Sequence, residues 1–498
     1  MPRTTTSRPL VIASVIAAMF MIAIEATIVS TAMPQIAAQL GGLQLYSWVF
    51  SSFLLTQTAM TVVFGKLSDV YGRRPVLLFG IAVFIVASVL CGFATSLPGL
   101  IVFRLMQGVG AGAIQPVGMT VVGDLYSAEE RGRVQGWLAS VWALSAVIGP
   151  LIGGFIVQHF SWAWVFWINV PVGLLAAAGF IAFLHETVAT RRHAVDWPGA
   201  MLFTVVVAAL MVGLTELGTD DLLTAGIALG IFVLGLALFL MQEARAAEPM
   251  INFSLWRRRA IAVANGVSLL AGVALVGLTT FLPMYVQGVL RQTPLVAGLA
   301  MTMMVVGWPI GATAAAKLLV RTGLRALFIA GAVLMPIGAL PFVLLTPASS
   351  PVTAGIGSAV LGLGMGLIST AALVMVQEMV DWAQRGSATA ANLFARNLGS
   401  TLGAAVLGAI LNYALGHTAG MAPITSDELR HLLEQGDLAG SADAAAIRNA
   451  LQHGLNLTFW GVLLVTIVAL ALAVFVPTVA LRRPAREIET ALVEEVTL

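Results

Sequence analysis

Long apolar stretches recur along almost the whole chain, and they constrain its fold more than any other feature. Runs of about 20 apolar residues follow one another between Pro9 and Val476, and a helix of that length crosses a hydrocarbon core of roughly 30 Å. Only 10% of the 498 residues are charged, against roughly 25% in soluble domains. We therefore expect an all-α membrane protein with many spans.

The apolar windows, separated by Gly, Pro and charged residues, predict fourteen transmembrane helices. Six lie in a first half (1–185), two in an insertion (186–259) and six in a second half (260–480), which is followed by a cytoplasmic tail (481–498). The predicted ranges are 9–33, 45–65, 75–95, 98–121, 133–157, 162–184, 197–217, 222–242, 261–288, 295–318, 325–346, 352–376, 388–413 and 455–478.

Basic residues are divided unevenly between the connections. With the N-terminus inside, the inner connections hold most of the 25 Lys and Arg residues, and the outer connections hold Arg291, Arg430 and Arg448. Because cytoplasmic loops collect Lys and Arg, we expect both termini in the cytoplasm and an even number of spans. The predicted location is the inner (cytoplasmic) membrane, with the lipid bilayer as the main surroundings.

An internal repeat relates the two halves. Gly65-Lys-Leu-Ser-Asp-Val-Tyr-Gly-Arg-Arg-Pro reappears as Ala316-Lys-Leu-Leu-Val-Arg-Thr-Gly-Leu-Arg-Ala at a constant offset, which pairs Gly72 with Gly323 (323 − 72 = 251). Both copies join the second and third helix of their half. Many secondary transporters are built from such paired halves with a site between them. The inserted helices have no repeat partner.

One long polar segment, 416–454, is expected on the periplasmic side. It contains Ser426-Asp-Glu-Leu-Arg-His-Leu-Leu-Glu and 444–452, and each predicts a short helix, the first with a Ser N-cap. The segment is either a plain surface excursion or a gate or docking element over the exit path. A periplasmic accessory protein is compatible with the second interpretation, and we expect the chain itself to be a monomer.

Charge and motif content exclude several functions. A net charge of +2 is too small to indicate a nucleic-acid partner. The single cysteine, Cys91, excludes an internal disulfide, and the six histidines lack metal-ligand spacing. There is no phosphate-binding loop and no nucleophile paired with a base. We therefore expect neither an enzyme nor a cofactor or metal site.

Glu25 is the only one of the 23 acidic residues that lies deep inside a predicted span. An ionisable group inside the membrane is costly, so it is a functional hypothesis by default. Counted from the outer helix ends, Glu25 and Arg104 lie roughly 12 and roughly 9 Å deep at about 1.5 Å per residue, which puts them at nearly one level. A Glu whose distance from an Arg changes between conformations could take up and release a proton. A static ion pair is the alternative.

The strongest local motif is Gly65-x-x-x-Asp69-x-x-Gly72-Arg73-Arg74, which lies between two apolar helices on the inner side. Glycine allows a tight reversal and close helix contact, and an acid among arginines can form a latch that holds in one conformation only. Simple topology charges are the alternative interpretation. The motif resembles the cytoplasmic signature of the major facilitator superfamily.

Further segments resemble the fourteen-helix drug:proton antiporter family within that superfamily, and together they cover nearly the whole chain. They are Ile24-Glu-Ala-Thr-Ile-Val-Ser-Thr-Ala-Met-Pro34, Arg104-Leu-Met-Gln-Gly-Val-Gly-Ala-Gly-Ala113, Gly149-Pro-Leu-Ile-Gly-Gly154, Trp164-Val-Phe-Trp-Ile-Asn-Val-Pro-Val-Gly173, Asp196-Trp-Pro-Gly199 and Arg396-Asn-Leu-Gly-Ser-Thr-Leu-Gly403. The resemblance implies a major facilitator fold of two six-helix bundles with two inserted helices.

The resemblance also implies roles for individual residues. The acid of helix 1 and the arginine of helix 4 take part in proton coupling in this family, and the matching residues are Glu25 and Arg104. The antiporter signature of helix 5 acts as a hinge that faces the other half, although close helix packing explains small residues there equally well. The residues that match this signature are Gly149, Pro150, Gly153 and Gly154.

A few positions depart from the family pattern. Glu25 stands where aspartate is usual, Ser30 where asparagine is usual, and Val70 where a basic residue is common. The second deep acid that some members carry in helix 13 is not found. These departures weaken the case for coupling to several protons and for doubly charged substrates.

Several polar and aromatic residues within the spans suit an amphipathic cavity that holds varied ligands, although packing is the alternative for each of them. Arg396 in addition needs a counter-ion, carbonyl groups or water, and Glu378 and Asp381 lie too far toward the inner end to serve. The candidate cavity residues are Gln57, Gln115, Trp142, Asn265, Trp308, Asn392, Phe394 and Arg396.

The sequence thus predicts a proton-coupled efflux antiporter that exports lipophilic or amphipathic small molecules, such as drugs, dyes and antiseptics, by alternating access. Two alternatives stay open. The chain could export one metabolite or lipid only, in which case its expression would protect against one compound. It could also be a membrane sensor or scaffold that moves nothing, which substrate-induced proton release, lost in Glu25→Gln, would exclude.

Overall fold

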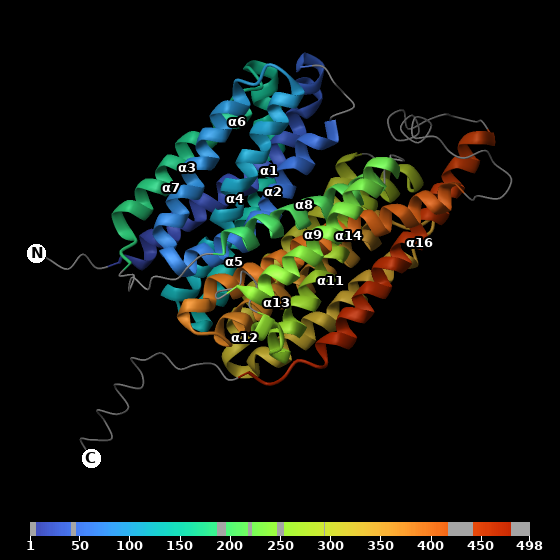
Figure 1. Cartoon of the computed structure of the whole chain (residues 1–498). Coiled ribbons are helices and arrows are strands. Elements are labelled where there is room, and N and C mark those ends of the chain that lie inside the picture. The colour runs from blue at the N-terminus through green and yellow to red at the C-terminus, as the bar shows by residue number, and fades with distance from the viewer. Residues whose placement is uncertain are drawn as a thin grey trace, which may run out of the picture.

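The computed structural model describes residues 6–40, 46–186, 196–217, 222–246, 253–292, 294–416 and 442–479. The regular secondary structure of these residues is entirely helical. The long helices form two bundles that lie against each other, with the start of α1 and the end of α16 toward the same side of the molecule (Figure 1).

The helices follow the order of the two halves and the insertion. The first bundle contains α1 (Arg8–Leu40), α2 (Tyr46–Tyr71), α3 (Arg73–Gly92), α4 (Leu97–Leu125), α5 (Ala128–His159), α6 (Trp164–Trp167) and α7 (Asn169–Phe183). The insertion contains α8 (Trp197–Leu217) and α9 (Leu222–Arg245). The second bundle contains α10 (Phe253–Trp256), α11 (Arg259–Met284), η2 (Tyr285–Val289), α12 (Pro294–Val343), α13 (Pro351–Glu378), η3 (Trp382–Gln384), α14 (Arg385–Gly416) and α16 (Ala442–Ala473).

Each of the fourteen predicted ranges coincides with helical residues, with three differences in detail. The range 162–184 is divided at Ile168 into α6 and α7. The ranges 295–318 and 325–346 are joined into α12 with a sharp bend at Gly323. The range 444–452 is helical as expected but is not a separate helix, because it forms the start of α16, whose candidate span already begins at Arg448. The helix expected from Ser426 lies outside the described residues.

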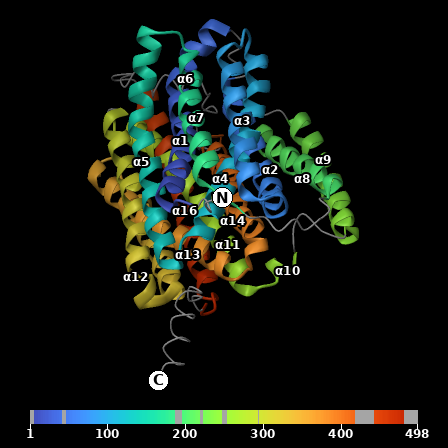
Figure 2. The same cartoon turned by 90° about the vertical axis from the view of Figure 1, so that its left-hand side faces the viewer.

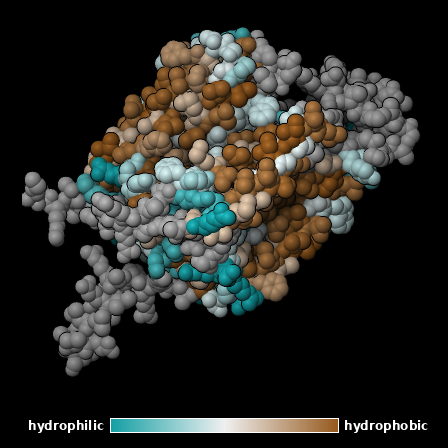
Figure 3. Space-filling view, in the orientation of Figure 1, coloured by the Kyte–Doolittle hydropathy of each residue, from teal (hydrophilic) through white to brown (hydrophobic). Residues whose placement is uncertain are grey.

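Helix length and surface character identify the chain as a multi-pass membrane protein. Twelve described helices are long and apolar enough to cross a membrane, and one of them, Val296–Val343, contains both helices that meet at Gly323. Hydrophobic residues dominate the surface of both bundles, while many of the more hydrophilic described residues gather at the lower left of the view (Figure 3). Such a surface is stable only against lipid.

The internal repeat is visible in the backbone. Gly72 has φ 95° and ψ 159°, and Gly323 has φ 76° and ψ 165°. They are the glycines with positive φ among the described residues. Glycine adopts positive φ without the steric cost that a side chain brings. The two residues that the repeat pairs therefore make the same single-residue reversal, each between the second and third helix of its half.

The inserted helices pack beside the junction of the two bundles. α8 packs along α9 and also contacts α2 of the first half and α14 of the second, and Figure 2 shows the pair at one side of the molecule. The Phe203 ring lies 5.4 Å from the Phe394 ring of α14 and 5.6 Å from the Phe239 ring of α9, measured between centroids. The outer helix α9 exposes many large apolar side chains, including Leu223 and Leu234.

Candidate functional site

A buried ion pair lies inside the first bundle. Glu25 of α1 and Arg104 of α4 are 0% and 2% exposed, and Glu25 Oε1 lies 2.5 Å from Arg104 Nη1. The second carboxylate oxygen accepts a hydrogen bond of 2.5 Å from Asn169 Nδ2, at the start of α7. The pairing expected from the equal depth of the two residues is confirmed. Asn169 was missed, because the resemblance placed it only in a helix-entry segment.

Further polar groups hold the guanidinium in place. Arg104 Nη1 also donates to Gln107 Oε1 at 2.6 Å, and Arg104 Nε donates to the Val49 carbonyl at 3.1 Å. Gln107 Nε2 in turn donates to Ser88 Oγ at 2.8 Å. The guanidinium carbon lies 4.4 Å from the centroid of the Phe53 ring. Polar side chains from α1, α3, α4 and α7 thus form one continuous buried network around the pair.

The motif 65–74 lies at the contact between the two halves, and the end of the molecule that carries it is called the motif end here. Asp69 Oδ1 accepts from the Gly386 N–H at 2.9 Å, and Asp69 Oδ2 accepts from the N–H and the Oγ of Ser387 at 2.8 and 2.7 Å. Gly386 and Ser387 belong to the first turn of α14. A carboxylate there binds the free N–H groups and the positive end of the helix dipole.

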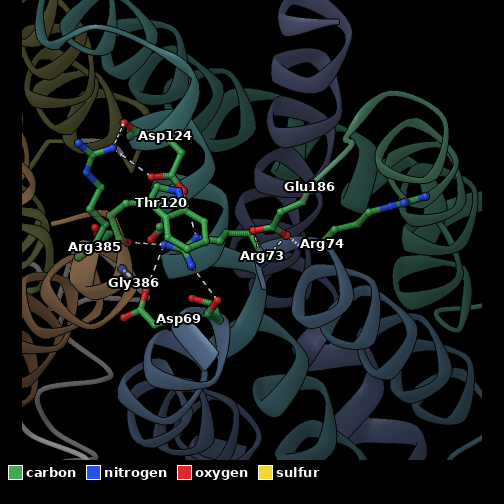
Figure 4. A network of polar contacts seen from close by, with 12 residues as sticks. Asp69, Arg73, Arg74, Thr120, Asp124, Glu186, Arg385 and Gly386 are labelled. Atoms are coloured by element: carbon green, nitrogen blue, oxygen red, sulfur yellow. Dashed lines mark hydrogen bonds and ion pairs between the residues drawn. The ribbon is translucent and has the colours of Figure 1, made fainter. Parts of the chain in front are cut away.

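Arg73 connects Asp69 to a second carboxylate. Arg73 Nη2 lies 3.2 Å from Asp69 Oδ1, and Arg73 Nε donates to Asp124 Oδ2 at 3.0 Å. Figure 4 shows the Arg73 side chain reaching between the two acids. Arg73 Nη2 also donates to the Trp382 carbonyl across the interface, and the guanidinium carbon lies 4.0 Å from the Trp382 ring centroid. This arginine is 2% exposed, so its charge is held by contacts rather than by bulk water.

Arg74 points away from this network (Figure 4). Its Nη2 donates to the Ile181 carbonyl at 2.7 Å. The backbone N–H groups of Arg73 and Arg74 donate to the Glu186 carboxylate, the shortest at 2.8 Å. Glu186 therefore caps α3 directly after the Gly72 reversal, a role that its position after the sixth predicted span gave no reason to expect.

Two ion pairs cross between the halves in a symmetric arrangement. Arg385 of α14 lies 3.2 Å from Asp124 of α4, and Arg131 of α5 lies 2.8 Å from Glu378 of α13. The arginines are one repeat apart (385 − 131 = 254), and so are the acids (378 − 124 = 254). Burial lowers the pKa of Arg131 from its ordinary value, and the Glu378 carboxylate opposes this shift. Each half thus supplies an arginine at a helix start and an acid at a helix end.

Small residues bring the helices of opposite halves together at the motif end. A Cβ atom on Gly65 would lie 2.3 Å from Ala390 Cβ, and one on Gly132 would lie 2.6 Å from Ala316 Cα. Both contacts join the halves. Gly149 instead faces Thr27 of α1 in its own half, at 2.0 Å from its Oγ1 by the same measure. Gly149 therefore does not face the other half, and the expectation that it does is wrong. Gly132, near the start of α5, is a glycine of that helix that does face α12 of the other half.

The remaining residues of the helix 5 segment lie further along α5. Gly153 is buried, and Gly154 has nothing within 4 Å of where its Cβ would be. Pro150 lies within α5, which continues through it to His159. Close packing therefore explains Gly149 but not Gly154.

A cavity of about 670 Å³ lies between the halves. Residues of both bundles line it, and Met211 and Val212 of the inserted helix α8 contribute to its wall. Most lining side chains are apolar, and Trp48, Trp142 and Trp308 add aromatic surface. The volume suits a drug-sized molecule, since such sites usually measure about 300–1,000 Å³. Thr27 of α1 lines this cavity, only two residues from Glu25.

Six of the eight candidate cavity residues lie in the wall, and two do not. Asn265 is fully buried and accepts a hydrogen bond of 3.0 Å from Asn392 Nδ2. Phe394 packs against Phe203 of α8. Both predictions are wrong because the sequence does not determine which face of a helix turns toward the cavity. The six lining residues are Gln57, Gln115, Trp142, Trp308, Asn392 and Arg396.

Comparisons with known proteins agree with this architecture. A family model described as Major Facilitator Superfamily matches residues 15–404. The chain is 33% identical to the multidrug transporter protein MdtP of Bacillus subtilis (strain 168), over 90% of this chain and 82% of that protein. It is 34% identical to multidrug resistance protein 3 of the same organism, over 82% of this chain and 81% of that protein.

The fold is also similar to that of a solved transporter. The human organic anion transporter MFSD10 (TETRAN) matches 95% of this chain and 100% of its own length with a TM-score of 0.64, at 14% sequence identity. At that identity the match concerns the fold alone. The family model and the two bacterial relatives identify a membrane transporter and not an enzyme. The chain belongs to the major facilitator superfamily.

Proposed function

We propose that the chain is a proton-coupled efflux antiporter of the fourteen-helix type, which exports lipophilic or amphipathic small molecules by alternating access. The observation that carries the proposal is the fully buried Glu25, held by Arg104 and Asn169 next to a cavity between the halves. The names of the two Bacillus subtilis relatives, one a multidrug transporter protein and the other a multidrug resistance protein, support the class of substrate.

Protonation of Glu25 can act as the trigger because the hydrogen bonds to its carboxylate come from N–H donors. Both carboxylate oxygens accept hydrogen bonds, from Arg104 and from Asn169. An added proton would turn one acceptor into a donor that faces another donor. It would also remove the charge that balances the buried guanidinium. The network would have to rearrange, and α1 would carry that change to Thr27 in the cavity wall.

The described conformation is closed at the motif end, which we assign to the cytoplasm from the distribution of Lys and Arg. Hydrogen bonds across the interface join residues 69–131 of the first half to residues 377–387 of the second. We assign this conformation to the outward-facing part of the cycle. Opening toward the cytoplasm would break the contact of Asp69 with α14 and both symmetric ion pairs.

A transport assay in proteoliposomes tests the proposal. A pH gradient is imposed with acid on the side opposite the substrate, and a panel of dyes with positive, neutral and negative charge is followed. The wild type is expected to move at least one dye only when the gradient is present, and Glu25→Gln is expected to lose this dependence. Glu243→Gln in α9 is the matched control, since Glu243 is also a buried carboxyl but lies in the insertion.

The double variant Glu25→Gln, Arg104→Gln keeps the test valid if the single change unfolds the protein, because it leaves neither charge unpaired. Gradient-independent movement in the wild type and in the Glu25 variant would defeat antiport. No movement of any dye by the wild type would defeat transport of this class of compound.

A further inference from the structure

Arg396 is the only charged residue among the described residues that line the cavity. It lies near the middle of the candidate span Trp382–Leu411, 14 residues from one end and 15 from the other (396 − 382 = 14; 411 − 396 = 15). Among the described lining residues there is no carboxylate. The cavity therefore has a net positive charge at the depth of the membrane where an unpaired charge is most costly.

No described side chain pairs with the Arg396 guanidinium. The acids of the second half that lie closest along the chain serve elsewhere, since Glu378 pairs with Arg131 and Asp381 lies at the motif end beyond the start of α14. Glu25 is bound to Arg104 and Asn169 in the other bundle. The other arginine in a comparable membrane position, Arg104, has a carboxylate, an amide and a carbonyl around it.

The polar residues one turn before and one turn after Arg396 on α14 do not supply a counter-charge, and their donors are in use. Asn392, one turn before it, donates its amide N–H groups to Asn265 Oδ1 and Ser268 Oγ, both at 3.0 Å. Ser400, one turn after it, donates to backbone carbonyls of Gly272 and of Arg396 itself. Asn397 also lines the cavity, but its amide is neutral, so the guanidinium is the charged group on this face of α14 that can bind a ligand.

The rest of the wall suits the body of such a ligand. Trp142 of α5 and Trp308 of α12 belong to the same cavity as Arg396 of α14, together with leucine, valine and methionine side chains. A guanidinium binds planar oxyanions through two parallel N–H bonds and is bound less strongly by water than an ammonium group. Aromatic and aliphatic walls hold an apolar body by buried area.

We propose that the cavity binds amphipathic organic anions, with the acid group of the ligand on the guanidinium of Arg396 and its apolar or aromatic body against Trp142 and Trp308. The ligand thus supplies the counter-charge that the protein lacks. The inference rests on the proposed export of amphipathic compounds and narrows their class to carboxylates, sulfonates and related oxyanions. Cations, in contrast, meet a like charge and no acid in this wall.

Equilibrium binding to the purified full-length protein tests this proposal without relying on transport. Three probes share a naphthyl body and differ in charge: naphthalene sulfonate, naphthalene methanol and naphthylmethyl trimethylammonium. Binding is measured by equilibrium dialysis in one low-salt buffer, free of added carboxylates and sulfonates, for all three probes. The wild type is expected to bind the sulfonate about tenfold or more tightly than the ammonium probe, because a charge-assisted hydrogen bond contributes that much or more.

Variants at one position separate charge from shape. Arg396→Gln is expected to weaken binding of naphthalene sulfonate about tenfold or more and to change binding of naphthalene methanol less than about twofold. Arg396→Lys should keep a preference for the sulfonate. Arg257→Gln, at an exposed arginine outside the cavity, is the control and should match the wild type. Unchanged binding of naphthalene methanol would show that the cavity of the Arg396→Gln variant is intact.

Three outcomes of these measurements would overturn the proposal: sulfonate binding that survives Arg396→Gln, ammonium binding as tight as sulfonate binding, or no sulfonate binding to the wild type. A fourth would be chloride binding that is saturable, is lost in Arg396→Gln and is not displaced by the sulfonate. The last outcome would identify a resident inorganic ion. Failure here leaves proton-driven export of neutral compounds standing, whereas sulfonate binding without gradient-driven movement of any dye would defeat the proposed function alone.

Discussion

Glu25 Oε1 lies 2.5 Å from Arg104 Nη1, and both side chains are sealed inside the first bundle. Removal of one member of a buried ion pair leaves the other charge without a partner, which usually costs about 3–5 kcal/mol. The two members differ, however, in how they can respond. A carboxylate can take up a proton and become neutral, whereas a guanidinium keeps its charge in proteins.

This asymmetry gives the first prediction. At about pH 7.5, Glu25→Gln and Arg104→Gln should each lower the free energy of unfolding by about 3 kcal/mol, and the double variant should lose less than either single variant. On acidification to about pH 5, Arg104→Gln should regain stability, because its native state binds a proton that the unfolded state mostly lacks. Glu25→Gln should regain none. Thermal unfolding of the four proteins in detergent measures this, and additive losses would contradict it.

The second prediction concerns the contact of Asp69 with α14. Asp69→Asn removes the charge that accepts from Gly386 and Ser387 and pairs with Arg73. The ratio of molecules with a closed motif end to molecules with an open one should fall about tenfold, which corresponds to the loss of one charged hydrogen bond. Spin labels on Arg133→Cys and Arg321→Cys, two exposed positions in a Cys91→Ser background, report the opening as a longer distance.

Asp196→Asn is the control for this measurement. Asp196 also accepts from a helix-start N–H, that of Gly199 at 3.0 Å, but it does so in the insertion. If Asp69→Asn and Asp196→Asn give the same distance distribution as the parent, Asp69 does not hold the motif end closed.

Part of this architecture follows from the sequence alone. The apolar windows locate the helices, and the repeat pairs Gly72 with Gly323, which have the same unusual backbone conformation. The depth count also places Glu25 level with Arg104, where the ion pair lies. These successes depend on periodicity, length and charge, which the sequence records directly.

The remaining contacts depend on how the helices are rotated and on which ends meet, and a single span does not record either. Asn265 and Phe394 lie on α11 and α14 as expected but face neighbouring helices. The pairs Arg385–Asp124 and Arg131–Glu378 join residues more than two hundred positions apart. The two arginines, like the two acids, are 254 positions apart in the sequence. This offset differs from the 251 of the glycine repeat, and no apolar pattern marks it.

The third prediction concerns the close approach of α2 and α14. A Cβ on Gly65 would lie 2.3 Å from Ala390 Cβ and 2.9 Å from the Gly386 carbonyl. Gly65→Ala should therefore destabilise the closed motif end by about 1–3 kcal/mol, the usual cost of overpacking. The same change at Gly230 in α9, where nothing lies within 4 Å, should leave stability equal or slightly raised, because alanine favours a helix by about 1 kcal/mol over glycine.

Unfolding temperatures of these two variants, together with the spin-label distance at the motif end, check this prediction. A shift toward the open distance in Gly65→Ala and not in Gly230→Ala is expected. Equal unfolding temperatures and equal distances for both variants would mean that α2 and α14 do not need this close contact.

The last prediction joins the proposed proton site to the proposed anion site through charge balance. Export of one anion in exchange for one proton moves two positive charges inward, whereas exchange of a neutral compound moves one. A potential of about 100 mV, negative inside, contributes about 2.3 kcal/mol for each charge moved.

In proteoliposomes with a potassium diffusion potential and no pH gradient, loss of trapped naphthalene sulfonate should therefore respond to the potential more steeply than loss of a neutral dye. Arg396→Gln should lose the movement of the sulfonate and keep that of the neutral dye. Glu25→Gln, which exchanges no proton, should reduce the charge moved with each sulfonate from two to one and remove the dependence of neutral-dye movement on the potential. Sulfonate movement by the wild type that is independent of the potential would contradict one-for-one exchange of an anion with a proton.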